Sequence, residues 1–170
     1  QRQMCIRDRI YKINQSGDGI LSEETAYLVE RSLDLYEATD GAFDIAIYPV
    51  MKAWGFTDDN FRVPDADELK DLLTLTDASD ISYDKETSQI AFKKDGMQID
   101  FGGIAKGYTS ARIMDIFRAC GIKSGLVNLG GNVQALGTKK DGSSWRVAVQ
   151  DPQDTDQYLG VLSIQDKACL

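Results

Sequence analysis

The spacing of apolar residues first predicts an amphipathic helix from Ser22 to about Asp40. Ser22 is a suitable N-cap, because its hydroxyl can accept a backbone N–H, and two glutamates follow it in the first turn. The apolar face of this helix would consist of Ala26, Val29, Leu33 and Tyr36. A second helix is predicted to begin at Pro64, with Asp65 and Glu68 as a capping box. Its buried stripe would be formed by Leu69, Leu72 and Leu73.

Alternation of apolar and polar residues predicts several short strands. They are expected at residues 81–83, 89–93, 98–101, 125–129, 133–136, 145–149 and 159–164. After the third strand the spacing becomes helical from Ile104, and this helix would end at Gly121, a glycine C-cap. Its inward face would carry Tyr108, Ala111, Ile113, Ile116 and Phe117. Because helices and strands do not alternate regularly, we expect an α+β fold with a mixed, largely antiparallel sheet and packed helices.

The composition excludes several classes of protein. Lys and Arg number 19 and Asp and Glu number 27, and the net charge of -8 argues against a nucleic-acid partner, which needs clustered basic residues. Histidine is absent, so Ser-His and Cys-His catalysis cannot be built from this chain. The three cysteines match neither a zinc pattern nor a disulfide framework. Any metal would therefore take oxygen ligands, which favours magnesium or calcium.

Candidate chemistry is concentrated where the third predicted strand meets the helix that follows it. Gly102 and Gly103 stand at this junction, where glycine permits dihedrals that a side chain forbids and allows another group to approach the backbone. Free N–H groups at a helix start favour an anion such as phosphate, and Lys106 adds a full positive charge. Asp100 supplies the opposite charge, as a cation ligand or an acceptor for a ribose hydroxyl would. The plainer alternative is a tight turn, with Lys106 a solvated helix residue.

Two further segments offer candidate binding residues. Gly130-Gly131 follows an apolar strand, and we expect this second glycine pair to come close to the first, because the two strands that they end share one helix. A simple turn or a bulge is the alternative for it. Phe43 and Asp44 could form a pocket wall for a flat ring system, or could serve packing alone. For Trp54 and Phe56, packing of a helix onto the sheet is the favoured interpretation.

Taken together, these residues resemble the FAD:protein FMN transferase family, the ApbE-like flavin transferases. The resemblance spans residues 10–170 and rests on five ordered motifs, at residues 40–44, 54–56, 100–108, 127–132 and 145–152. It implies a magnesium-dependent enzyme that cleaves the diphosphate of FAD. The FMN half would be transferred to a threonine or serine hydroxyl of a target flavoprotein, such as a subunit of a membrane redox complex.

The resemblance also implies roles for individual residues. FAD would be contacted by Ala42, Phe43, Asp44, Asp100 and Lys106. Lys106 would in addition be the catalytic residue, holding the phosphates together with the helix start. The backbone carbonyl of Gly103 would be one ligand of Mg²⁺, which suits an oxygen-only shell. The family's remaining metal ligands, an Asp and a Thr, are expected beyond Leu170.

We expect the chain to be an internal part of a longer protein. Within residues 1–9, the MCIRD stretch matches the translation of a sequencing-library transposon end, and these nine residues are set aside as a non-native artefact. Residues 10–170 would form a partial flavin transferase domain without its N-terminal and C-terminal segments, inactive or nearly so by itself. The family is usually exported and anchored to the membrane as a lipoprotein, which implies an extracytoplasmic location. Two other functions stay open: an FAD pyrophosphatase that releases FMN and AMP, and a flavin-binding protein without turnover.

Overall fold

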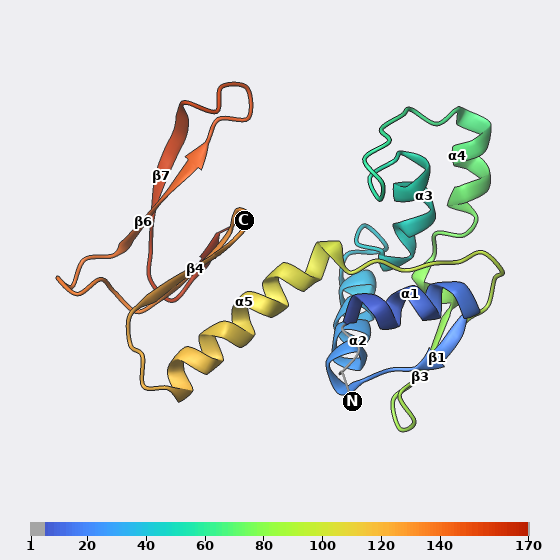
Figure 1. Cartoon of the computed structure of the whole chain (residues 1–170), viewed down its shortest axis with the longest axis horizontal. Coiled ribbons are helices and arrows are strands. Elements are labelled where there is room, and N and C mark those ends of the chain that lie inside the picture. Colours follow the sequence, from blue (N-terminus) through green and yellow to red (C-terminus); the bar gives the residue numbers. More distant parts are fainter. Residues whose placement is uncertain (1–5, 170) are drawn as a thin grey trace. The chain divides into compact units, whose positions relative to one another are not determined.

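The computed structural model describes residues 6–169, which fall into two compact units (Figure 1). The first unit extends to Ile104 and the second begins at Ala105. Every strand pair in both units is antiparallel. The predicted α+β class with largely antiparallel pairing is therefore confirmed, but among the described residues the strands are divided over three small sheets.

The first unit packs helices around a small sheet with strand order β1-β3-β2. Its helices are α1 (Ile6–Ser16), α2 (Glu23–Ala38), α3 (Tyr48–Ala53) and α4 (Ala66–Leu73), with 3₁₀ turns η1 (Ile45–Ile47) and η2 (Ala78–Asp80). Its strands are β1 (Asp18–Ile20), β2 (Ile81–Asp84) and β3 (Gln89–Phe92). The core of the unit includes Leu28, Val29, Ile90 and Ile99, which are fully buried.

The predicted helix starting at Ser22 is confirmed as α2, and its cap is the one expected. The hydroxyl of Ser22 accepts the backbone N–H of Thr25 at 3.4 Å. The second predicted helix is confirmed as α4, and the Asp65 carboxylate accepts the N–H of Glu68 at 2.8 Å. The predicted buried stripe of α4 is wrong at Leu73, whose side chain is 56% exposed.

Helix α1 was not predicted, although two of its isoleucines, Ile10 and Ile13, are buried. The helix includes residues 6–9, and residues 1–5 lie outside the described part of the chain. The proposed non-native origin of residues 1–9 stays a prediction. Besides these two core residues, α1 contributes Asn14, whose side chain binds a segment 85 residues further along.

That segment, residues 98–101, is not the strand that the alternation predicted. The alternation itself is correct, because Ile99 and Phe101 are buried while Gln98 and Asp100 are half-buried. The backbone hydrogen bonds of Ile99 are taken by Asn14 instead of a strand: its Oδ1 accepts the Ile99 N–H at 2.8 Å, and its Nδ2 donates to the Ile99 carbonyl at 2.9 Å. A side-chain amide can thus replace a neighbouring strand, since it carries one donor and one acceptor in the right positions.

Helix α5 (Gly102–Ala119) begins two residues earlier than predicted, so both glycines of the first pair lie inside it. Its C-terminus is the expected one: Gly121 has φ +75°, and the N–H of Ile122 bonds the carbonyl of Phe117 at 2.9 Å. The predicted inward face is wrong at Ala111 and Ile116, which are exposed. Ser110 and Met114 are the residues of α5 that are buried.

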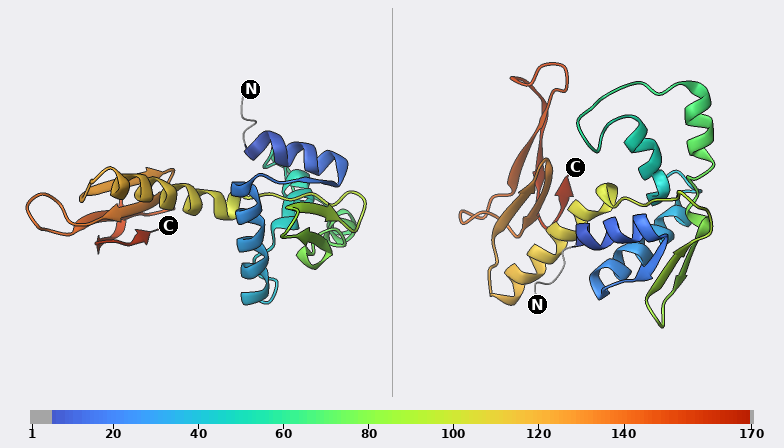
Figure 2. Two further views of the ribbon diagram at one scale, coloured as in Figure 1. Left: turned by 90° about the horizontal axis from the view of Figure 1, so that it is seen from below. Right: turned by 45° about the vertical axis from the view of Figure 1, so that its right-hand side comes forward.

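The second unit holds two small sheets, of which the one containing β4 lies alongside α5 (Figure 2). One consists of β4 (Gly125–Leu129), β5 (Asn132–Leu136) and β8 (Ala168–Cys169); the other is a hairpin of β6 (Trp145–Gln150) and β7 (Tyr158–Ile164). Val133, Ala135 and Ile164 form the core between the sheets, with Trp145 and Val147 packed on it. The four strands predicted after α5 are confirmed as β4 to β7, with bounds within one residue of those expected. The side chains of β4 alternate between half-buried and exposed. Among the described helices, none is long and apolar enough to cross a bilayer.

Candidate functional site

The segment with Ala42, Phe43 and Asp44 follows the C-terminus of α2. A side chain at the end of that helix hydrogen-bonds the backbone of the segment. The hydroxyl of Thr39 accepts the N–H of Phe43 at 3.0 Å. Ala42 is exposed, and Phe43 and Asp44 are half-buried. The backbone of this segment is therefore held in one conformation by the last turn of the helix before it.

Asp44 has a structural role that the sequence did not indicate. Its Oδ1 accepts the N–H of Ala46 at 2.7 Å and caps η1, while its Oδ2 accepts the N–H of Ala78 at 3.0 Å. Partial burial raises the pKa of this carboxyl group, and the two backbone bonds oppose that change. Both oxygens are thus engaged within the protein, and any flavin contact must use the lone pairs that these bonds leave.

Asp100 and the first glycine pair form the start of α5. The Asp100 carboxylate accepts the N–H of Gly102 at 2.6 Å, and its own N–H bonds the carbonyl of Ile45 at 2.8 Å. A Cβ on Gly102 would lie 2.7 Å from Asp100 Oδ1, and one on Gly103 would lie 3.0 Å from a carbon of the Phe43 ring. Neither glycine has a positive φ, so the predicted need for unusual dihedrals is wrong here. At both positions, then, a neighbouring side chain would have to shift to make room for a Cβ.

Lys106 contacts the second glycine pair, whereas the expected approach of the first glycine pair to the second stays a prediction. The ammonium group of Lys106 donates to the carbonyl of Gly130 at 3.3 Å. Gly130 and Gly131 have φ values of +58° and +94° and form the two-residue turn between β4 and β5, which matches the turn alternative. The side chain of Asn128 closes this turn by accepting the N–H of Gly131 at 3.0 Å.

This corner, formed by Lys106, Asn128, Gly130 and Gly131, is chemically suited to an anion. An ammonium group carries three donors, and the single bond to Gly130 leaves two of them for a ligand. Lys106 is exposed, so its charge is accessible to a phosphate group. The hydrogen bond to the Gly130 carbonyl holds the ammonium group at the turn between β4 and β5.

Gly107, the next residue of α5, has no structural reason to be glycine. A Cβ there would meet nothing within 4 Å, and its φ is not positive. We therefore expect Gly107→Ala to raise the free energy of unfolding by about 0.5–1 kcal/mol, because alanine loses less backbone entropy inside a helix. Urea denaturation of the complete protein measures this; a destabilised variant would show that Gly107 is in contact with something in that protein. If FAD affinity falls while stability rises, close approach of the ligand explains this glycine.

The implied magnesium site would need several oxygen ligands close together. Among residues 6–169, no three Asp, Glu, Cys or His side chains gather in a way that could hold a metal ion. Gly103 lies in the first turn of α5, and its carbonyl can supply one oxygen ligand at most. The described residues therefore do not fit a complete magnesium shell by themselves.

The aromatic motif at residues 54–56 forms a local cluster. The rings of Trp54 and Phe56 stack with centroids 6.4 Å apart, and Phe61 meets Phe56 edge-on at 5.7 Å. Phe56 is 58% exposed, so the prediction that it packs a helix onto the sheet is wrong. Gly55 closes the loop, with φ +80° and the backbone of Asn60 directly against it.

Comparison with known proteins agrees with this architecture. The ApbE family model matches residues 6–170. The chain is 34% identical over 130 residues to an FAD:protein FMN transferase of Klebsiella pneumoniae (strain 342), covering 76% of this chain and 39% of that protein. It is 35% identical over 153 residues to one of Treponema pallidum (strain Nichols), covering 82% and 42%. The chain thus spans about two fifths of the length of these curated relatives.

Solved structures show the same fold. The crystal structure of the ApbE protein of Thermotoga maritima superimposes with a TM-score of 0.88 at 30% identity, over 97% of this chain and 54% of that one. The apo flavinyl transferase ApbE of Pseudomonas stutzeri gives a TM-score of 0.80 at 27% identity, over 96% and 52%. With the family model matching nearly its whole length and two relatives above 30% identity, the chain belongs to the ApbE family.

Proposed function

We propose that the complete protein transfers FMN from FAD to a threonine or serine hydroxyl of a target flavoprotein. Membership in a family whose relatives are named FAD:protein FMN transferase supports this reaction. The observation that carries it is the 3.3 Å contact between the Lys106 ammonium group and the Gly130 turn, which holds an accessible positive charge on a fixed backbone corner.

In this reaction the acceptor hydroxyl oxygen forms a bond to the phosphorus of the FMN half. The bond from that phosphorus to the bridging oxygen breaks, AMP leaves, and the hydroxyl proton is released. Negative charge increases on the phosphate oxygens during the transfer, and Lys106 is proposed to stabilise it. Ala42, Phe43, Asp44 and Asp100 are proposed to contact FAD, with Asp100 also holding the start of α5.

The test is incubation of the complete protein with FAD, Mg²⁺ and a candidate acceptor domain, followed by denaturing electrophoresis. We expect flavin fluorescence to migrate with the acceptor, and to disappear when its target threonine or serine is replaced by alanine. Flavin that stays entirely free while AMP appears would instead indicate an FAD pyrophosphatase. Bound but uncleaved FAD would indicate a flavin-binding protein without turnover.

Magnesium dependence is part of the proposal, with the Gly103 carbonyl as one ligand and the others from outside residues 6–169. Chelation of divalent cations is expected to abolish transfer, and added Mg²⁺ to restore it. Transfer that continues at full rate in excess chelator contradicts this part. Residues 10–170 alone are proposed to be inactive, because the described residues do not complete the metal shell.

An extracytoplasmic, membrane-anchored location is likewise proposed from the family resemblance alone. It is tested by fractionating cells that produce the complete protein and asking whether the protein is protected from protease added outside the inner membrane. Protection would contradict an extracytoplasmic location.

A further inference from the structure

A hydrogen-bond network lies behind the proposed flavin-contacting residues and was not indicated by any motif. The hydroxyl of Tyr36, in the last turns of α2, donates to Asp77 Oδ1 at 2.8 Å. The same oxygen accepts the N–H of Ser79 at 2.9 Å and caps η2. The preceding amide of that turn, from Ala78, donates to Asp44 Oδ2 at 3.0 Å. Tyr36 is thus connected to Asp44 through one short turn.

Tyr36 also contacts the segment 42–44 from its other side. The N–H of Gly41 bonds the Tyr36 carbonyl at 2.9 Å, and a Cβ on Gly41 would lie 3.5 Å from the Tyr36 ring. Gly41 has φ +79°, so the chain reverses direction against this ring. Tyr36 therefore contacts Gly41, the residue before this segment, and is connected through Asp77 and Ala78 to Asp44, the last residue of the segment.

We propose that Tyr36 and Asp77 are positioning residues that hold the segment 42–44 in the conformation that binds FAD. The ligand in this inference, FAD, rests on the proposed function. The part that concerns how the network holds the segment 42–44 does not depend on that function. The network consists of groups that satisfy each other: Ser79 and the Tyr36 hydroxyl both bond the Asp77 carboxylate, and its pKa is lowered accordingly. Loss of the Tyr36 hydroxyl leaves that carboxylate with one bond fewer, so η2 and Asp44 lose part of their support.

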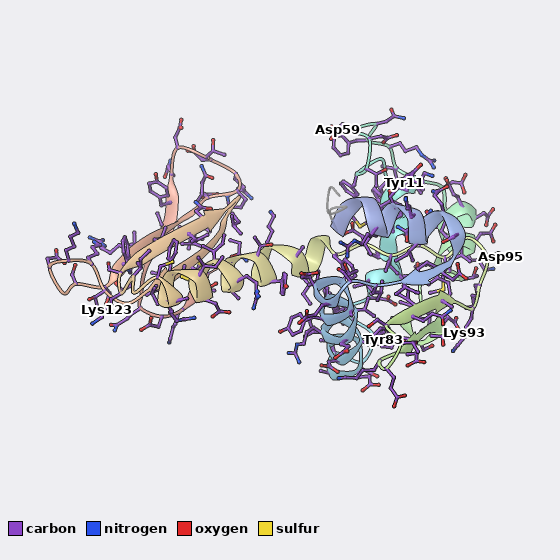
Figure 3. All side chains as sticks on the ribbon, turned by 60° about the horizontal axis from the view of Figure 1, so that its bottom comes forward. Tyr11, Asp59, Tyr83, Lys93, Asp95 and Lys123 are labelled. Carbon is purple, nitrogen blue, oxygen red and sulfur yellow. The ribbon has the colours of Figure 1, made fainter. Side chains whose placement is uncertain are left out.

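The chain offers a matched control. Tyr83, which Figure 3 labels, is half-buried like Tyr36. Its hydroxyl also donates to a carboxylate, that of Glu30, at 3.1 Å. The Tyr83→Phe change removes the same atom and the same kind of bond in the same unit. Among the described residues, no hydrogen bond joins Tyr83 or its partner Glu30 to residues 42–44 or 77–79. A general loss of stability would affect both variants alike.

The experiment compares Tyr36→Phe with Tyr83→Phe in the complete protein, by amide hydrogen exchange and by FAD titration. In Tyr36→Phe, exchange at the amides of Phe43, Ala46 and Ala78 is expected to speed up about tenfold, and the FAD Kd to rise about fivefold or more. The transfer rate at saturating FAD should stay within about twofold, since a positioning residue touches no reacting atom. Tyr83→Phe should change none of these.

Two Asp77 variants complete the test. Asp77→Asn keeps an oxygen acceptor and should retain most FAD affinity, whereas Asp77→Ala should match or exceed the loss in Tyr36→Phe. If amide exchange in Tyr36→Phe is the same as in wild type, the inference is overturned, whatever the FAD affinity of the variant. Faster exchange with unchanged FAD affinity also overturns it. If the wild-type protein binds no FAD, the proposed function fails and the flavin part of the inference with it, while the exchange data still decide whether the network holds the segment.

Discussion

Replacing Lys106 with methionine is expected to slow FMN transfer by the complete protein about 100-fold or more, the usual effect of removing one preorganised charge stabiliser. Methionine keeps an unbranched side chain but removes the ammonium group that bonds the Gly130 carbonyl at 3.3 Å. The charge on the phosphate oxygens is greatest in the transition state, so the rate at saturating FAD should fall more than the FAD affinity.

The control for this variant is Lys123→Met. Lys123 is an exposed lysine of the same unit (Figure 3) and follows the end of α5. Both changes should leave the free energy of unfolding within about 0.5 kcal/mol of wild type, as is usual for exposed side chains. Lys123→Met should also keep the wild-type transfer rate. A Lys106→Met protein with undiminished transfer would remove Lys106 from the catalytic role.

The second large effect concerns stability and the aromatic motif. Gly55→Ala is expected to lower the free energy of unfolding by about 3 kcal/mol, from left-handed backbone strain and overpacking together. Gly55 has φ +80°, and a Cβ would lie 2.0 Å from the carbonyl oxygen of Asn60. Because that oxygen belongs to the backbone, the loop carrying Phe56 and Phe61 would have to move.

Gly17→Ala separates the two causes. Gly17 has almost the same φ, +81°, but a Cβ there would meet nothing within 4 Å. This variant should lose only the cost of the left-handed conformation, about 1–2 kcal/mol. Urea denaturation of both variants gives the difference. Equal losses would show that the loop at Gly55 is not closed against Asn60 in solution.

Local signals in the sequence were sufficient for some parts of the fold. The Ser22 and Asp65 caps, the Gly121 terminus and the turn at Gly130-Gly131 each depend on residues within a few positions of one another. Their chemistry is visible in the sequence because hydroxyl, carboxylate and glycine have specific roles at such positions. The family motifs were recognised for the same reason: their residues are contiguous.

Long-range partners were not predictable in this way. Asn14 binds Ile99 across 85 positions, and its amide has no periodicity that marks it. The alternation at 98–101 correctly gave the buried face, but it could not reveal that a side chain replaces the neighbouring strand. Asp44 is expected as a flavin contact, whereas its Oδ2 bonds the amide of Ala78, in a turn 34 residues away that the sequence around Asp44 does not reveal. A sequence shows which groups can bond, and the fold decides which partners they find.

The most direct test of the proposed site is a crystal structure of the complete protein with FAD bound. We expect the Lys106 ammonium group to lie about 3 Å from an oxygen of the FAD diphosphate, a charge-assisted hydrogen bond. Its contact with the Gly130 turn should persist. FAD bound elsewhere, with its diphosphate out of reach of Lys106, would contradict the proposed role of this corner.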